Sequence, residues 1–307
     1  MQETLEQWRN NGEYFIIKPN GWRLFYRQWG DKSALPQDTL LLLHGFPESS
    51  FSFHKVVSGL LSQFKRIVVF DMLGYGFSDK PNQHYSYSLI AQTDIACQLW
   101  QHLGVRGGHV LSHDMGTSVL TELLTRQVTS QLPAFFDVGL LSATFTNGSM
   151  VLQFARLRLM QRLLLSRIGR TVSQFSRYTM FKRSILSAHG GMGEHGLNEN
   201  DIKQLWESFS YDDGHKKSHG TIRYLNDRKR FEQSRWLPAL SQADKVMPIH
   251  LCWGEADHVA RIEMAHYLAR EHCPQATLSV MKGVGHFCQI GSPDIWLKNI
   301  RNFYQGM

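Results

Sequence analysis

The sequence has little of what marks membrane, secreted or disordered chains. Its longest apolar runs, such as Thr39–Leu43 and Ile67–Phe70, are as short as single strands, whereas a helix that crosses a membrane needs about 20 apolar residues. The first residues, Met1–Gln7, are polar and hold no apolar core of a signal peptide. Nine prolines and 25 glycines among 307 residues exclude a collagen-like chain and do not indicate disorder. We therefore expect a folded chain without an integral membrane segment.

Cysteine is also scarce. Cys97, Cys252, Cys273 and Cys288 are scattered along the chain, and they show neither the spacing of metal ligands nor that of a disulfide framework. Thiols that stay reduced are typical of the cytoplasm. The cysteine pattern therefore predicts a cytoplasmic protein without a metal site.

Acidic residues are absent from one long segment. Between Val138 and Gly193 there is no aspartate or glutamate, but there are eight basic residues: Arg156, Arg158, Arg162, Arg167, Arg170, Arg177, Lys182 and Arg183. The formal net charge of the chain is +7, so this segment accounts for all of it. No helix-turn-helix, zinc or RNA-binding pattern accompanies the charges, which argues against a nucleic-acid partner. Two interpretations stay open: a solvated helix surface, or a weak association with an anionic membrane surface.

Short apolar runs alternate with amphipathic segments in the first half of the chain. Thr39–Leu43, Ile67–Phe70 and His109–Ser112 have the length of strands, and Tyr87–Leu103 carries apolar residues at helical spacing. Continuous apolar strands that alternate with helices are typical of a parallel sheet covered on both faces. We therefore predict an α/β fold with a mostly parallel sheet.

This alternation is interrupted in the middle of the chain. Residues 147–236 are basic and helical in pattern, with a predicted helix over Leu152–Ile168. Strands and helices alternate again from Pro248–Trp253 and Ala276–Val280 onward. The predicted organisation is a core of residues 1–146 and 237–307 with an inserted helical lid of residues 147–236.

The clearest chemical signal is the segment Ser112–Gly116. It lies between a predicted strand and a predicted helix, and it has small residues two positions before and two after Asp114. This is the pattern of a nucleophile elbow, a sharp turn that exposes its central side chain. A carboxylate at the centre attacks an sp3 carbon and forms an ester with it. Alternatively, Asp114 serves only as the N-cap of the helix.

Three further segments follow strands and carry groups that such a nucleophile needs. His44–Pro47 follows the first strong strand, Asp257 follows a late strand, and His286 follows the last one. The carboxyl ends of parallel strands meet at one edge of the sheet, where open α/β folds bind ligands. The order nucleophile, acid, histidine is the order in α/β hydrolases.

Together these motifs resemble those of the epoxide hydrolase and haloalkane dehalogenase group of α/β hydrolases. The segments that carry the resemblance are His44–Ser49, Asp71–Pro81 and Ser112–Asp114. The lid stretch Tyr224–Phe231, with Trp236–Leu240 after it, is similar to that of one branch, the mesoderm-specific transcript protein and its bacterial relatives. The resemblance extends from about Trp8 to Tyr304 and implies an α/β-hydrolase fold with a lid.

The resemblance also implies a two-step mechanism. Asp114 would attack a substrate carbon, and His286, oriented by Asp257, would then activate water to hydrolyse the ester. The backbone N–H groups of Phe46 and Met115 would hold the oxyanion. Because every reacting group comes from the chain, neither a metal nor an organic cofactor is expected.

Departures from the group bear on the substrate. Its dehalogenases hold the departing halide with side-chain N–H groups at the positions of Phe46 and Met115, and neither side chain offers one, which argues against a haloalkane. Epoxide hydrolases use two lid tyrosines to protonate the opening epoxide. Tyr224 fits the later one, and Tyr178 or Tyr211 could serve as the earlier one.

Two histidines complete the predicted substrate side of the site. His113 is a rival base, although the residue before the nucleophile usually points into the core, and His44 is expected to shape the oxyanion loop. The resulting prediction is an epoxide hydrolase-like enzyme acting on a small apolar substrate. The alternatives are a hydrolase of another electrophile, such as a β-lactone or an ester, and a non-catalytic ligand-binding protein with this fold.

Overall fold

The computed structural model describes residues 3–81, 85–148, 150–155 and 157–307. Arg156, one of the eight basic residues of the acid-free segment, lies outside the described residues.

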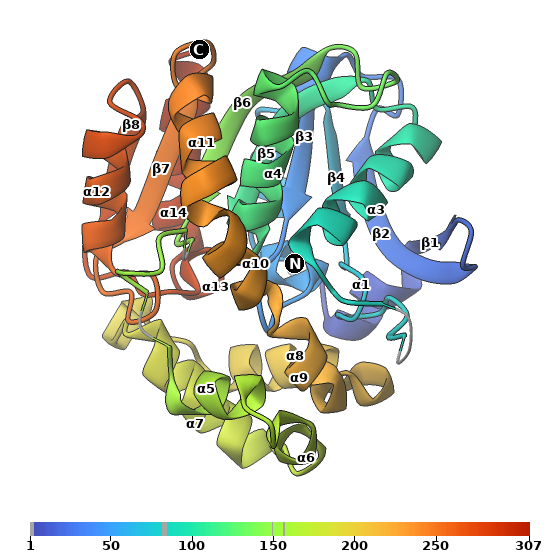
Figure 1. Ribbon diagram of the computed structural model, residues 1–307, viewed down its shortest axis with the longest axis vertical. Helices are drawn as coiled ribbons and strands as arrows, with labels where there is room; N and C mark the ends of the chain where they lie inside the picture. The colour runs from blue at the N-terminus through green and yellow to red at the C-terminus, as the bar shows by residue number, and fades with distance from the viewer. Residues whose placement is uncertain (1–2, 82–84, 149, 156) are drawn as a thin grey trace.

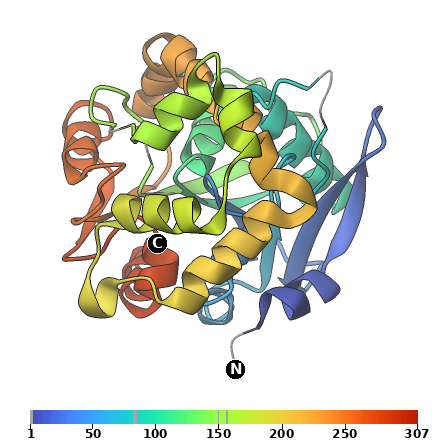
Figure 2. The same cartoon turned by 90° about the horizontal axis from the view of Figure 1, so that it is seen from below.

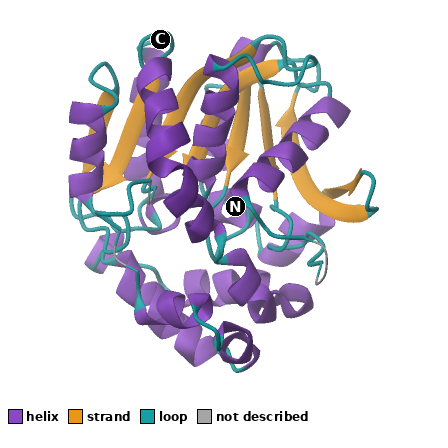
Figure 3. Cartoon of the chain, in the orientation of Figure 1, coloured by secondary structure: helices purple, strands orange, loops and turns teal. Residues whose placement is uncertain are grey.

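A sheet of eight strands forms the centre of the molecule (Figure 3), in the order β1-β2-β4-β3-β5-β6-β7-β8. The strands are β1 (Glu13–Ile17), β2 (Trp22–Gly30), β3 (Thr39–Leu43), β4 (Arg66–Phe70), β5 (Gly107–His113), β6 (Gly139–Thr146), β7 (Ile249–Gly254) and β8 (Thr277–Met281). The pairs β1–β2 and β2–β4 are antiparallel. All other pairs of this sheet are parallel, which confirms the predicted α/β class.

Helices cover both faces of the sheet (Figure 1), so its central strands are buried on both sides. One face carries α3 (Leu89–His102), α4 (Gly116–Val128), α11 (Leu237–Ala243) and α12 (Ile262–Glu271). The other carries α1 (Leu5–Asn10), α2 (Val57–Leu60) and α14 (Pro293–Gln305), and the short α13 (Cys288–Gly291) precedes α14. Burial on two sides explains why the central strands are continuous apolar runs.

The lid covers the edge of the sheet at which β3 to β7 end (Figures 1 and 2). Its helices are α5 (Leu159–Leu165), α6 (Gly169–Gln174), α7 (Tyr178–His189), α8 (Glu199–Ser210), α9 (Ser218–Thr221) and α10 (Tyr224–Phe231). A π-helical turn, Glu232–Trp236, joins α10 to α11. At this turn Trp236 Nε1 donates to Glu122 of α4 at 2.9 Å. The end of the lid is therefore fastened to the core.

The helix predicted over Leu152–Ile168 is wrong in its extent. Among the described residues of this range, the structure has one short helix, α5, which begins at Leu159 and ends at Leu165, and α6 begins after the range at Gly169. Arg158, just before α5, has an extended backbone whose N–H donates to the Gln161 side chain at 2.8 Å. Gly169 packs so closely that a Cβ atom there would lie 1.9 Å from the Leu164 carbonyl oxygen. Gly169 begins α6, beyond the predicted range. Within the range, the apolar spacing is helical, but extended backbone at Arg158 and at Ser166 limits the helix to α5.

Among the residues that the structure describes, no helix combines the length and the apolar character needed to cross a bilayer. All four cysteines are buried free thiols.

Candidate active site

The turn between β5 and α4 has the geometry of a nucleophile elbow. Asp114 has a φ of +43°, in the left-handed region that aspartate tolerates better than most residues. Gly116 lies so close to the end of β3 that a Cβ atom there would be 2.5 Å from the Leu43 carbonyl oxygen. Only glycine therefore fits after Met115, and the tight turn presents Asp114 at the edge of the sheet.

The Asp114 carboxylate accepts a hydrogen bond from the turn after β3. The N–H of Phe46 donates to Asp114 Oδ2 at 3.0 Å. Met115 stands at the beginning of α4, where the backbone N–H groups and the helix dipole favour a negative charge. Phe46 thus contacts the carboxylate directly, and Met115 follows Asp114 at the start of α4. That these two N–H groups hold an oxyanion stays a prediction.

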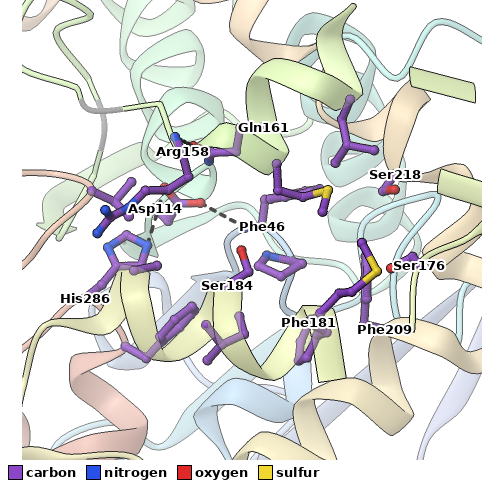
Figure 4. Close-up of a pocket in the computed structure, with 18 of the residues that line it drawn as sticks. Phe46, Asp114, Arg158, Gln161, Ser176, Phe181, Ser184, Phe209, Ser218 and His286 are labelled. Carbon is purple, nitrogen blue, oxygen red and sulfur yellow. Dashed lines mark hydrogen bonds and ion pairs between the residues drawn. The ribbon is translucent and has the colours of Figure 1, made fainter. Parts of the chain in front are cut away.

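His286 and Asp257 form a hydrogen-bonded pair beside the elbow. Nδ1 of His286 donates to Asp257 Oδ2 at 2.8 Å, and its Nε2 lies 3.9 Å from Asp114 Oδ1. The second distance is too long for a hydrogen bond. Figure 4 shows Asp114 and His286 facing each other at one end of a cavity. The structure therefore brings together the three residues that the sequence predicts as catalytic.

The carboxylate of Asp257 is held firmly. Its Oδ1 accepts the backbone N–H groups of Val259 and Ala260 at 2.6 and 2.9 Å. Its Oδ2 also accepts Nδ2 of Asn147 at 2.7 Å. Asn147 directly follows β6 and has a φ of +46°. Sequence analysis missed this residue, although an asparagine directly after a buried strand was the available signal.

Burial and charge act in opposite directions on His286. Burial disfavours the charged imidazole, but the carboxylates of Asp257 and Asp114 outweigh it and raise the pKa of His286 above its ordinary value. His286 can thus take a proton readily while the two carboxylates stabilise the imidazolium.

His113 lies behind the site rather than in it. Its Nδ1 donates to Glu48 Oε2 at 2.6 Å and its Nε2 to the backbone oxygen of His286 at 2.9 Å. Although burial opposes the charge, Glu48 raises the pKa of His113 well above its ordinary value. An imidazole with two acceptors is a cation and cannot act as a base. Glu48 was missed in the sequence, and it also accepts from Gln289 Nε2 at 3.0 Å.

His44 is not among the described residues that line the cavity. Its Nε2 accepts the N–H of Met72 at 2.9 Å and its Nδ1 donates to the carbonyl oxygen of Gly45 at 2.8 Å. Burial lowers the pKa of His44, so the ring is neutral and shapes the turn that carries Phe46. The prediction that His44 and His113 bind substrate is not supported by these contacts.

A narrow cavity of about 80 Å³ opens from Asp114 and His286 into the lid (Figure 4). Apolar side chains make up most of its wall, among them Met160, Leu164, Phe181, Ile185 and Phe209. Its polar lining includes Arg158, Gln161 and Ser184. Arg158 is therefore not part of a purely solvated arginine surface, which corrects the sequence interpretation for this residue.

The three predicted lid tyrosines lie in different places. Tyr224 is buried, and its ring centre is 6.0 Å from that of Phe46. Burial, and after it the charge of Asp114, raises the pKa of Tyr224. Tyr178 instead donates its hydroxyl to Glu199 at 2.5 Å, and the ring of Tyr211 packs on Phe77. None of the three tyrosines is among the described residues that line the cavity. Tyr224 is the one that packs against a lining residue of the oxyanion turn, Phe46.

Arg228 is a further residue that sequence analysis did not single out. It is fully buried, its Nε donates to Ser118 Oγ at 2.7 Å, and its Nη2 lies 3.3 Å from the Asp114 backbone oxygen. Its guanidinium carbon is 5.0 Å from the centre of the Tyr224 ring, a cation–π distance. Arg228 therefore ties the lid helix α10 to the elbow.

Within the described ranges, no group of three or more histidine, cysteine, aspartate or glutamate side chains is arranged to hold a metal ion.

Comparisons with known proteins agree with this architecture. A family model described as alpha/beta hydrolase fold matches residues 38–293. LipZ of Mycobacterium tuberculosis is 36% identical over 294 residues, which cover 94% of each chain. The human mesoderm-specific transcript homolog protein is 30% identical over 298 residues, which cover 95% of this chain and 85% of that protein. These two matches confirm the resemblance to that branch.

Two other matches are more limited. The soluble epoxide hydrolase of Corynebacterium sp. is 37% identical over 100 residues, covering 33% of this chain and 32% of that protein. The crystal structure of a bromoperoxidase from Bacillus anthracis aligns with a TM-score of 0.74 over 96% of this chain and 99% of that chain, at 14% identity. At this identity the structural match supports the fold alone.

Proposed function

Because the chain belongs to the α/β-hydrolase fold family, we propose that it is a hydrolase with covalent Asp-His-Asp catalysis that acts on an epoxide. One observation carries the proposal: a carboxylate, Asp114, occupies the elbow and faces the His286–Asp257 pair. A carboxylate nucleophile suits attack on an sp3 carbon, because the product is an ester that water can hydrolyse.

In the first step, an Asp114 oxygen attacks one carbon of the epoxide ring. The carbon–oxygen bond of the ring breaks, and the released oxygen takes a proton from the Tyr224 hydroxyl. Tyr224 regains a proton from solvent. Tyr224 packs beside Phe46, whose N–H donates to Asp114, and this position supports the role. Burial and the charge of Asp114 raise the pKa of Tyr224, which keeps its hydroxyl protonated until the ring opens to a strongly basic alkoxide oxygen. This step leaves the substrate bound to Asp114 as an ester and needs no base.

In the second step, Nε2 of His286 takes a proton from water, and the hydroxide attacks the carbonyl carbon of the Asp114 ester. The Phe46 N–H, which already donates to Asp114 Oδ2 at 3.0 Å, stabilises the oxyanion that forms there. Collapse breaks the bond between that carbonyl carbon and the substrate oxygen. His286 returns its proton to the departing substrate oxygen, the diol leaves, and Asp114 releases the proton of its regenerated carboxyl group to solvent. This offsets the proton that Tyr224 took up in the first step.

The leaving group favours an epoxide over a haloalkane. A departing halide is stabilised by N–H donors, and the side chains of Phe46 and Met115 supply none. An opening epoxide instead needs an acid, and Tyr224 is a phenol on the lid beside Phe46. The partial match to a soluble epoxide hydrolase is consistent with this choice.

A panel of terminal and internal alkyl epoxides tests the proposal. We expect the purified protein to form diols from at least one member, and to release no bromide from matched bromoalkanes. Tyr224→Phe should slow single-turnover formation of the ester by about 10²-fold, as for the loss of a general acid. Hydrolysis of the preformed ester should change little, since Tyr224 takes no part in it.

The control for Tyr224→Phe is Tyr178→Phe, which removes a lid hydroxyl that lies on Glu199. It should leave both steps unchanged. Bromide release without diol formation would reject the epoxide as substrate class. Equal slowing of both steps in Tyr224→Phe would mean that Tyr224 only packs the lid.

A further inference from the structure

The cavity that opens at the nucleophile is also lined by a positive charge. Among the described residues that line it, Arg158 is the one lysine or arginine, and most of the others are apolar. Figure 4 shows Arg158 reaching from the lid toward Asp114 and His286. A guanidinium that moves from water into an apolar cavity loses part of its favourable hydration free energy.

Two elements of the lid hold Arg158 in this position. Its backbone N–H donates to Gln161 Oε1 at 2.8 Å at the start of α5. Its Nη2 donates to the backbone oxygen of Ser187 in α7. Gln161, three residues further along, lines the same cavity, because residues three apart share a helix face. The cation is thus positioned before any substrate arrives, which lowers the entropy cost of binding.

We infer that the substrate carries a carboxylate close to its reacting carbon and that Arg158 binds it. This inference rests on the proposed hydrolase site. The negative charge of Asp114 would repel an anionic substrate, and a guanidinium in the wall of the same cavity offsets the repulsion. A guanidinium also matches a carboxylate with parallel N–H donors. Beyond it, Leu164, Phe181 and Ile185 provide an apolar wall for an alkyl chain. The fitting substrate class is a 2,3-epoxyalkanoate.

Unreactive ligands test the carboxylate site independently of catalysis. Calorimetry would compare octanoate with its neutral counterpart octanamide. We expect octanoate to bind the wild-type protein at least ~30-fold more tightly, in line with the cost of losing one partner of a desolvated charge pair. Arg158→Gln should abolish this preference without weakening octanamide, whereas Arg158→Lys should keep part of it. The matched control is Arg162→Gln, an exposed arginine of the same helix, which should change nothing.

The reactive pair is 2,3-epoxyoctanoate and 2,3-epoxyoctanamide. We expect Arg158→Gln to raise KM for the acid and leave KM for the amide unchanged. Equal binding of octanoate and octanamide to the wild type, or equal weakening of both in Arg158→Gln, would overturn the inference. Octanoate preference without turnover of any epoxide would instead reject the proposed reaction and leave the carboxylate site standing.

A second inference comes from the outer surface of the lid. We call this surface the basic lid face and define it by Leu159, Arg162, Arg167, Ile168, Arg170, Phe175, Arg177 and Arg183. All eight are exposed, and the apolar members are unusually so, at 74% for Leu159, 57% for Ile168 and 65% for Phe175. They come from the segment 157–193, which contains no acidic residue. Figure 2 looks onto the lid and shows α5 to α7 on this outer side.

We propose that the basic lid face docks on an anionic lipid surface. Exposed apolar side chains surrounded by arginines are the composition of an interfacial segment, whose apolar groups enter the headgroup region while its cations bind anionic lipids. The same helices supply Met160, Leu164 and Val172 to the cavity wall. A docked lid would therefore take up an amphiphilic substrate directly from the bilayer.

Co-sedimentation with vesicles tests the docking. We expect binding to vesicles that contain phosphatidylserine and little binding to phosphatidylcholine alone. Binding should fall steeply between ~0.1 M and ~1 M salt, as the Debye length shrinks from ~10 Å to ~3 Å. Arg167→Glu with Arg170→Glu should release the protein, and so should Ile168→Ser with Phe175→Ser. Val246→Ser, which removes a side chain 75% exposed on the core, should not.

Hydrolysis of a dissolved substrate should be unchanged in all of these variants. Absence of binding at low salt, equal binding to both vesicle types, or full binding by the arginine reversal variant would each overturn the docking.

Discussion

Asp114→Asn is expected to abolish steady-state hydrolysis, with kcat lowered by at least ~10⁴-fold, as when a covalent nucleophile is removed. The amide oxygen of asparagine is a poor nucleophile, so no ester forms. Measured under single turnover in water labelled with ¹⁸O, the wild type should give diol that lacks the label, because the first oxygen delivered comes from Asp114. Label in the diol of the first turnover would show that water attacks the substrate directly.

Asparagine is the suitable replacement because of the backbone. Position 114 has a φ of +43°, and asparagine tolerates this region better than alanine. The amide oxygen can still accept the Phe46 N–H, so the turn should keep its shape. The melting temperature and circular dichroism spectrum should match those of the wild type. Mass spectrometry has to exclude deamidation back to aspartate, and retained turnover in a sample free of aspartate would reject the covalent mechanism.

The core of the fold could be predicted from sequence because its signals are local. Thr39–Leu43 is a strand with the same bounds in prediction and structure, since a strand buried on both faces has to be apolar throughout. The elbow is similarly local: glycine is needed at 116 because a backbone oxygen lies where a Cβ atom would be. The structure of a short segment can therefore be predicted from sequence when a single local requirement, such as burial on both faces or the lack of room for a Cβ atom, decides it.

The antiparallel strands β1 and β2 were not predicted. Their burial is mixed, with exposed residues at both ends of β2, so their pattern matches neither a continuous apolar run nor a strict alternation. The prediction for the first part of the lid failed for a related reason. Its apolar spacing indicated one helix over Leu152–Ile168, but extended backbone at Arg158 and Ser166 limits the helix to Leu159–Leu165. In both segments the secondary structure depends on the fold around the segment, which its own hydropathy pattern does not show.

The partners of the site were hidden for a different reason. Asn147, Glu48 and Arg228 are polar residues that became buried only because distant segments supply their hydrogen bonds. Hydropathy patterns treat such residues as exposed. The two outlying tyrosines show the converse: Tyr178 and Tyr211 were of the right type and on the right segment, but the helix orientation that decides where a ring points is set by packing.

His286→Gln is expected to separate the two chemical steps. The attack of Asp114 on the epoxide needs no base, whereas hydrolysis of the ester depends on Nε2 of His286. Steady-state turnover should therefore fall by ~10³–10⁴-fold, toward the upper end of what general bases contribute, while the first step proceeds. Intact-protein mass spectrometry should show a gain of one epoxide mass that stays stable, and peptide mapping should place it on Asp114.

The structure supplies the controls for this trap. Glutamine cannot replace the imidazole that Asp257 orients through a 2.8 Å hydrogen bond, so the hydrolytic water loses its base even if the pocket stays filled. His286→Gln combined with Asp114→Asn should gain no mass, which excludes alkylation of the other side chains. His189→Gln, which alters a lid histidine whose Nδ1 accepts the Phe287 N–H at 3.1 Å, should not accumulate the adduct. The covalent assignment would be wrong if His286→Gln turned over at the wild-type rate, or if its adduct mapped to a residue other than Asp114. The reason is that covalent catalysis by Asp114 makes the first step independent of His286 and the second step dependent on it.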